Sequence, residues 1–224
     1  MPFRTKKRAG KIFSLLKKKY PNAKIALRFS NTWELLVAVI LSAQCTDKKV
    51  NEVTPALFKK YRTLDDYVGA SASRRAEKEF ETMIRPTGFY HAKAKSILTT
   101  AKIVKEKFDG TVPKTMASML TLRGVARKTA NVVLGNAYGV VDGIAVDTHV
   151  RRLSQRLELS ISDDPKKIEQ DLMTLLPKKD WFRATYLLID HGRAVCSAKD
   201  PRCDVCPLSK ICPAAFQFPR FQKR

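Results

Sequence analysis

Residues 122–130 read LRGVARKTA, and this stretch determines the expected fold. One helix is expected over about 115–121 and a second over 128–138, with a very short turn containing Gly124 between them. In such a hairpin the backbone N–H groups that open the second helix face outward. Together with the positive end of the helix dipole, they form a natural site for a phosphate and read no base. A plain connection between two helices is the alternative.

Lys128 opens the second helix and follows Arg127 directly. The helix dipole and the neighbouring guanidinium both disfavour a protonated amine, so this lysine is a candidate nucleophile. A lysine forms Schiff bases with carbonyl-like carbon, and C1′ of a sugar that loses its base has that character. The alternative is one more phosphate-binding cation. Asp142 and Asp147 follow in VVDGIAVDTHV, where either carboxylate could stabilise positive charge or accept a proton, or simply cap a turn or helix.

The rest of the chain is also expected to be helical. The segment Asn31–Glu34 has the spacing of a capping box and opens an apolar, central helix that runs on to Gln44. Asp164–Pro165 and Asp180–Trp181 are interpreted as helix entrances. Further helices are expected over 47–60, where Pro55 is awkward, and over 73–83, 92–108, 148–157, 165–176 and 181–194. With no run of strand-like alternation, the pattern predicts an all-α fold.

Composition indicates a folded, nucleic-acid-binding protein. The 224 residues are 44% hydrophobic and 29% charged, which suffices for one or two packed domains. The formal net charge of +22 is spread along the chain, and this favours a polyanionic partner, with nucleic acid first. A ribosome-like or membrane-surface protein is the alternative, but neither accounts for the cysteines. The longest apolar run, 35–41, is too short to span a bilayer, and no signal peptide is recognisable, so we expect an intracellular protein without membrane attachment.

Four of the five cysteines fall in the stretch CSAKDPRCDVCPLSKIC, as Cys196, Cys203, Cys206 and Cys212. Four thiolates on a short polar loop can surround one soft metal centre, and the ligands would then fold the loop. Zinc and a [4Fe–4S] cluster both accept four cysteines. The intervals of six, two and five residues depart from two C-x-x-C knuckles and lean toward iron–sulfur. Cys45 stands apart and is interpreted as a small buried hydrophobe.

Several motifs, in this order, resemble the endonuclease III family of helix-hairpin-helix DNA glycosylases. They are LSAQCTD (41–47), TGFYHAKA (87–94), LRGVARKTANVV (122–133), AVDTHV (145–150), HGRAVC (191–196) and the cysteine spacing. The resemblance implies two helical domains with a DNA groove between them. One, residues 29–141, is a helical barrel that contains the hairpin at about 115–138. The other, 1–28 with 142–224, carries a [4Fe–4S] cluster on the loop 196–212.

The resemblance also implies roles for single residues. Lys128 becomes the nucleophile at C1′ of a flipped nucleotide, and Asp147, rather than Asp142, its activating carboxylate. Gln44 fills the space of the flipped base, and Phe89 is a wedge in the opposite strand. His149 is a tentative substrate contact, since a cap-stabilising or buried histidine fits equally well. The remaining expected DNA contacts lie in the hairpin and are Leu122, Arg123, Gly124, Ala126, Arg127 and Thr129.

The implied activity is excision of oxidised pyrimidines from double-stranded DNA through a lysine Schiff base. β-Elimination then cuts the strand 3′ to the abasic site, and the enzyme is expected to be a monomer. The alternatives are a monofunctional mismatch glycosylase and a non-catalytic, metal-stabilised DNA-binding module. Three features depart from the family pattern: Arg123 replaces a proline, Ala126 replaces a glycine, and the 140–143 loop is one residue longer. We expect these changes to alter how the protein binds DNA rather than the class of reaction.

Overall fold

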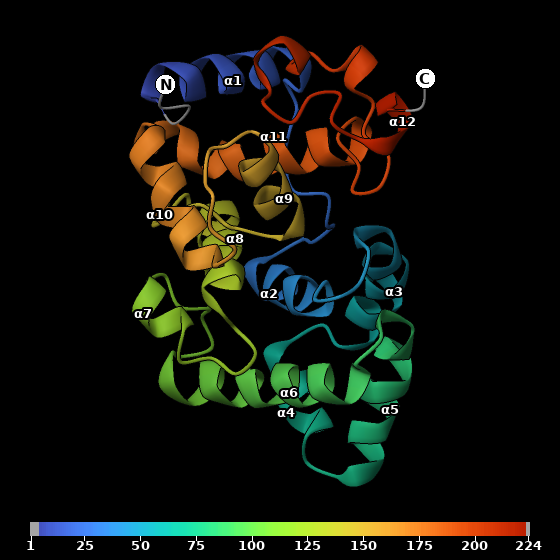
Figure 1. The fold of residues 1–224 in the computed structure, drawn as a ribbon. Coiled ribbons are helices and arrows are strands. Elements are labelled where there is room, and N and C mark those ends of the chain that lie inside the picture. The colour runs from blue at the N-terminus through green and yellow to red at the C-terminus, as the bar shows by residue number, and fades with distance from the viewer. Residues whose placement is uncertain (1–4, 223–224) are drawn as a thin grey trace. The chain divides into compact units, whose positions relative to one another are not determined.

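The computed structural model describes residues 5–222, and every regular element in that range is a helix (Figure 1). The all-α expectation is therefore confirmed for the described part of the chain. The α-helices are α1 Lys6–Lys19, α2 Thr32–Leu41, α3 Asp47–Lys60, α4 Leu64–Ala70, α5 Arg74–Ile84, α6 Tyr90–Lys107, α7 Met116–Met119, α8 Arg127–Tyr138, α9 Thr148–Arg156, α10 Pro165–Leu175, α11 Lys178–Ala194 and α12 Pro219–Gln222. Three 3₁₀ turns are η1 Arg85–Thr87, η2 Cys203–Val205 and η3 Ser209–Ile211. None of the helices in the described range is both long and apolar enough to cross a membrane.

Backbone contacts divide the chain into two compact units. The first is the continuous segment Ala26–Val140, which contains α2 to α8. The second combines the residues up to Ile25, with α1, and those from Val141 onward, with α9 to α12. The first unit is therefore inserted in the sequence of the second, so the described segments before Ala26 and after Val140 belong to one unit.

Helix α2 forms the centre of the Ala26–Val140 unit. Its residues 35–41 are all buried, and α3, α6 and α8 pack around it. At its start the Asn31 side chain accepts from the Glu34 N–H at 2.9 Å, as expected, whereas Glu34 reaches back to the N–H of Ser30 instead of Asn31. The expectation that this helix continues to Gln44 is wrong: α2 ends at Leu41, because Gln44 is in the left-handed backbone region (φ 52°) and cannot extend a right-handed helix.

The periphery of this unit contains one helix that the sequence pattern did not predict. Helix α4 is only seven residues long, and a capping box between Thr63 and Asp66 opens it. Its Tyr67 is fully buried, with edge-on contacts to Trp33 and Phe80. Helix α3 runs through Pro55 and spans the whole expected range.

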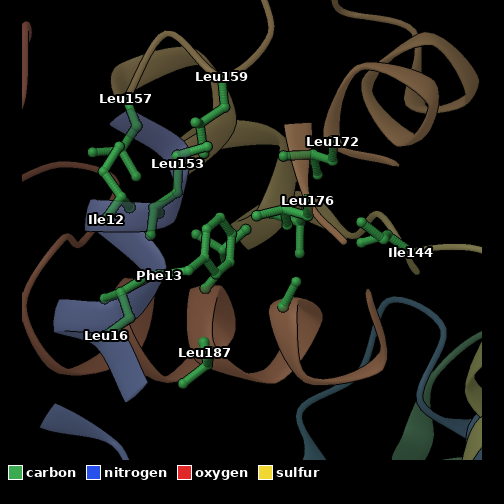
Figure 2. Close-up of a cluster of buried hydrophobic side chains, with 14 of the residues drawn as sticks. Ile12, Phe13, Leu16, Ile144, Leu153, Leu157, Leu159, Leu172, Leu176 and Leu187 are labelled. Carbon is green, nitrogen blue, oxygen red and sulfur yellow. The ribbon is translucent and has the colours of Figure 1, made fainter. Parts of the chain in front are cut away.

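The core of the other unit is formed where α1 packs on α10 and α11, and α9 on α10 and α11. Figure 2 shows Phe13 of α1 among leucines that include Leu187 of α11 and Leu176, the residue after α10. Asp164 caps α10 with Pro165 in its first turn, as expected. The second expected entrance is wrong, because α11 already begins at Lys178, after Pro177. Asp180 lies in its first turn and forms an ion pair with Lys17 of α1 at 2.7 Å.

Candidate functional site

The hairpin turn lies tightly against α6. Gly124 has φ +76°, and a Cβ added there would lie 2.7 Å from Cβ of Ser96 and 2.8 Å from its Oγ. Next to it, the buried hydroxyl of Thr100 donates to the carbonyl of Arg123 at 3.0 Å. Leu122 is buried under the turn. Glycine is therefore required twice, by the backbone conformation and by the approach to Ser96. The helix before the turn, α7, is shorter than the predicted 115–121.

Ala126 is the residue immediately before α8, and its backbone is extended (φ −91°, ψ 171°). Any residue adopts this conformation, so the alanine that replaces the family's glycine carries no left-handed penalty. Alanine also has no side-chain acceptor for the first N–H groups of α8, unlike the Ser, Thr, Asp or Asn usual at this position. The start of α8 is thus a helix terminus without a side-chain cap from its own capping residue, which is the arrangement that suits an external anion.

Lys128 is the second residue of α8 and is half-buried, as are Arg127 and Thr129 beside it. The first turn of α8 contains no acidic residue. The side chain of Arg123 is exposed, while Val125 anchors the turn from the buried side. Five of the six hairpin residues predicted to contact DNA are therefore at least partly exposed on one short segment of the Ala26–Val140 unit, together with Lys128, whereas the side chain of Leu122 is buried.

Gln44 and Phe89 share an unusual backbone. Both are non-glycine residues in the left-handed region, with φ of 52° and 48°. Both side chains are exposed, and 64% of the Phe89 surface is open to solvent, high for a large apolar residue. Gln44 lies just after α2, and Phe89 is the residue immediately before α6. Strained, exposed residues at helix ends are typical of binding sites, because the surrounding structure has to impose that conformation.

Asp147, in the other unit, caps helix α9. Its carboxylate accepts from the N–H of Val150 at 2.8 Å, and the side chain is half-buried. This fixes the direction of the carboxylate at the start of the helix. Asp142, the alternative left open by spacing alone, is exposed in the loop before it. Half-buried His149 has its Nδ1 3.2 Å from Nη2 of Arg152, and a Cβ added to Gly192 would lie 2.8 Å from that Nδ1. The contacts of His149 in this unit are thus with α9 and α11.

The four clustered cysteines line one cavity. Its wall also contains apolar side chains such as Leu157 and Phe218. Burial and the neighbouring sulfurs raise the pKa of Cys206, and burial raises that of Cys212 to about 11. In the described range, no three or more histidine, cysteine, aspartate or glutamate side chains converge closely enough for a single metal ion. The cysteines instead surround a shared space.

A side chain of α9 and a backbone N–H of the cysteine loop donate to these sulfurs, and a histidine of α11 lies next to one of them. Nη1 of Arg156 donates to Sγ of Cys196 at 3.2 Å, and the N–H of Leu208 donates to Sγ of Cys206 at 3.4 Å. His191 lies between Cys206, 3.5 Å from its Nε2, and the hydroxyl of Tyr20, 3.1 Å from its Nδ1. Four cysteines with N–H donors and an apolar wall fit a cysteine-ligated iron–sulfur cluster, whose sulfurs are stabilised by such hydrogen bonds.

Sequence reasoning missed the residues that hold these sites in place. Thr100 and Ser96 support the hairpin, and Arg156 and His191 contact the cysteines. Thr100 and Ser96 carried no motif of their own, and only their position on α6 shows their role. His191 stands at the start of HGRAVC, so the motif marked it without indicating which sulfur it meets.

Comparison with known proteins first defines the class. Residues 37–178 match the family described as the HhH-GPD superfamily of base excision DNA repair proteins. The matched range contains the whole hairpin, with Lys128, and also Asp147.

Individual relatives and solved structures define the family within this class. Endonuclease III of Synechocystis sp. is 51% identical over 210 residues, which cover 94% of each chain. A solved non-covalent endonuclease III–DNA complex is 40% identical with a TM-score of 0.90, covering 98% of this chain and 99% of that one. A trapped endonuclease III–DNA covalent intermediate, an estranged-adenine complex, is also 40% identical with a TM-score of 0.89, covering 95% and 98%. The chain belongs to the endonuclease III family of this superfamily.

Proposed function

We propose that this protein is a bifunctional DNA glycosylase and AP lyase that excises oxidised pyrimidines from double-stranded DNA. Lys128 is the nucleophile, and its position carries the proposal. It lies in the first turn of a helix whose capping residue offers no side-chain acceptor, directly after a turn suited to hold a phosphate. A DNA strand held there by its backbone brings a deoxyribose close to the amine. The relative described as a trapped covalent intermediate supports a covalent reaction in the family.

The reaction has two parts. The neutral amine of Lys128 attacks C1′ of the flipped nucleotide, the glycosidic bond breaks, and the base leaves with the bonding electrons and takes up a proton. Asp147 stabilises the positive charge that develops on the sugar and accepts the proton that the amine loses. The sugar ring opens to a Schiff base as O4′ takes up a proton from water. Water then accepts the C2′ proton, the C3′–O bond breaks, and the 3′ phosphate leaves with the bonding electrons. Hydrolysis of the Schiff base by water finally releases Lys128 and the unsaturated sugar aldehyde.

The proposed interface binds the phosphate backbone of the DNA and displaces one base from the duplex. The hairpin residues 122–129 bind phosphates without reading sequence. Gln44 and Phe89 enter the duplex, Gln44 in the space of the flipped base and Phe89 in the opposite strand, and so offset an unstacking cost of a few kcal/mol. The net charge of +22 supports strong, salt-dependent binding. We also propose His149 as a substrate contact and expect the protein to act at cellular DNA.

We also propose that Cys196, Cys203, Cys206 and Cys212 hold a [4Fe–4S] cluster. The shared cavity and the N–H donors at the sulfurs support it. When bound, the cluster supplies the cross-links that fold the loop 196–212, which has few apolar side chains of its own. Hydrolysis and elimination require no electron transfer, so no reaction step depends on it.

Borohydride trapping tests the proposed activity. Duplex DNA with one thymine glycol is incubated with the protein and sodium borohydride, which reduces a Schiff base to a stable adduct. We expect a one-to-one covalent complex, with peptide mapping that places the link on Lys128, and loss of the complex in Lys128→Ala. Lys102→Ala, an exposed lysine of α6, is the matched control and should trap normally. A wild-type protein that releases the base without any adduct would instead identify a monofunctional glycosylase.

A further inference from the structure

The end of helix α2 depends on a side chain from another helix. A helix leaves its last four carbonyls without partners inside the helix. In α2, three of these carbonyls have local partners. The carbonyl of Ala38 accepts from the N–H of Ser42, that of Val39 from the hydroxyl of Ser42, and that of Ile40 from the N–H of Ala43. The fourth, of Leu41, accepts from Nζ of Lys93 in α6 at 2.8 Å.

Lys93 makes a second bond of the same kind. Its Nζ donates to the carbonyl of Thr87, in η1, also at 2.8 Å. The lysine is only 5% exposed, and burial lowers its pKa. Thr87 is itself buried, and its hydroxyl donates to the carbonyl of Ile84. Removing an ammonium group from water carries a desolvation free energy. A buried lysine with two carbonyl acceptors therefore fills this space at a higher free-energy cost than an apolar side chain would.

The two carbonyls belong to the segments that present Gln44 and Phe89. Leu41 precedes Gln44 by three residues, and Thr87 precedes Phe89 by two. Both presented residues are in the left-handed region, which costs of the order of 1 kcal/mol for a residue with a Cβ. Such conformations persist only where neighbouring contacts impose them. The hydrogen bonds of the Lys93 side chain join these two segments.

We propose that Lys93 is a positioning residue that clamps the Gln44 and Phe89 segments to one another, so that both side chains enter the duplex at a fixed separation. This inference rests on the proposed function, since it concerns how the two side chains displace a base. Two residues that enter one duplex have to be ordered relative to each other, and a clamp formed in the free protein removes that ordering cost from the binding step. Lys93 therefore acts through Gln44 and Phe89 and touches no reacting atom.

Lys93→Met tests the clamp, because methionine has a similar length and no N–H donor. Two substrates separate insertion from chemistry: a duplex with thymine glycol, which requires base displacement, and a single-stranded oligonucleotide with an abasic site, which does not. We expect single-turnover excision from the duplex to fall at least tenfold, while the borohydride-trapping rate on the single strand stays within twofold of wild type. A 2-aminopurine opposite the lesion should lose most of its fluorescence rise on binding.

Ile97→Ala is the matched control, since Ile97 is fully buried on the same helix and has no polar group. It should lower the melting temperature without changing the ratio of the two rates. An equal loss on both substrates in Lys93→Met, or the same ratio in both variants, would overturn the proposal and leave Lys93 a purely structural residue.

Lys93→Gln covers the case in which Lys93→Met does not fold. Its shorter amide keeps two N–H donors, so we expect a duplex rate below wild type and an unchanged single-strand rate. An equal loss on both substrates would again contradict the clamp. Failure of the proposed function has a different signature, because wild-type protein would then form no adduct on either substrate.

Discussion

Gly124 is constrained both by its left-handed backbone conformation and by its close packing against Ser96. We expect Gly124→Ala to lower the free energy of unfolding by about 2–4 kcal/mol, since it adds a left-handed penalty of ~1 kcal/mol to an overpacking cost of ~1–3 kcal/mol against Ser96. Urea unfolding measures the change. Gly139→Ala is the control: Gly139 has φ +65° but open space around its added Cβ, so it should cost only about 1 kcal/mol. If both variants lower the free energy of unfolding equally, the turn can move away from Ser96 without a packing cost.

Arg123 stands where the family has a proline, and its side chain is exposed. We expect Arg123→Ala to weaken DNA binding to a similar degree on every sequence and to reduce the slope of log K against log salt by about one unit. Titration of labelled duplexes at several salt concentrations gives both quantities, with Lys102→Ala for comparison. A loss of lesion preference instead would mean that Arg123 does more than contact a phosphate.

The start of α8 allows stability and DNA binding to be separated at the scale of one element. Ala126 is extended and exposed, so Ala126→Asp can cap α8. We expect it to raise the free energy of unfolding by about 1 kcal/mol. It should at the same time weaken DNA binding, because its carboxylate would occupy and repel the phosphate site. Thermal unfolding and DNA titration measure the two effects.

Ala126→Ser separates the cap from its charge. It should stabilise α8 similarly and weaken DNA binding less than aspartate does. If both variants bind DNA as tightly as the original chain, the N–H groups at the start of α8 do not hold a phosphate.

Elements with strong local signals could be predicted from sequence, and those fixed by tertiary packing could not. Helix α6 was expected from its apolar periodicity and ends near Asp109–Gly110, both of which have positive φ. Helix α4 was missed, because seven residues show too little periodicity and the burial of Tyr67 among aromatic rings stabilises it. The end of α2 was misplaced since an apolar run has no stop signal, and Lys93, far along the chain, satisfies its last carbonyl.

The candidate site divides in the same way. Lys128, the hairpin and the cysteines are predicted as site residues from residue types and spacing, and these predictions need no partner from elsewhere in the chain. The backbone of Ala126 could not be decided, and it is extended rather than helical or left-handed. The supporting residues Thr100 and Arg156 were invisible because each acts on a residue more than 20 positions away.

At the scale of the whole molecule, we expect the cysteine loop to respond as a separate region to loss of the proposed cluster. We expect Cys203→Ser to lose bound iron and the hydrogen-exchange protection of 196–212, whereas Ala26–Val140 keeps its protection. Iron analysis and exchange mass spectrometry measure this. Cys45→Ser, outside the loop, should retain iron. Full iron content in Cys203→Ser would remove Cys203 from the ligand set, and collapse of both units together would show that the cluster stabilises the whole chain.

Because one unit is inserted in the sequence of the other, the inserted unit is complete first during synthesis and can fold first. Residues 26–140 emerge as one continuous segment and can fold while the ribosome is still at work. Helix α1 is synthesised before this segment, yet its apolar residues Phe13 and Leu16 pack in a core with Leu187 of α11. That partner comes about 170 residues later, which at ~5–20 residues per second is a delay of roughly 10–35 s. During this interval helix α1 exposes the apolar side chains that lie in the core of Figure 2 once the chain has folded, which makes it a segment that a chaperone could bind.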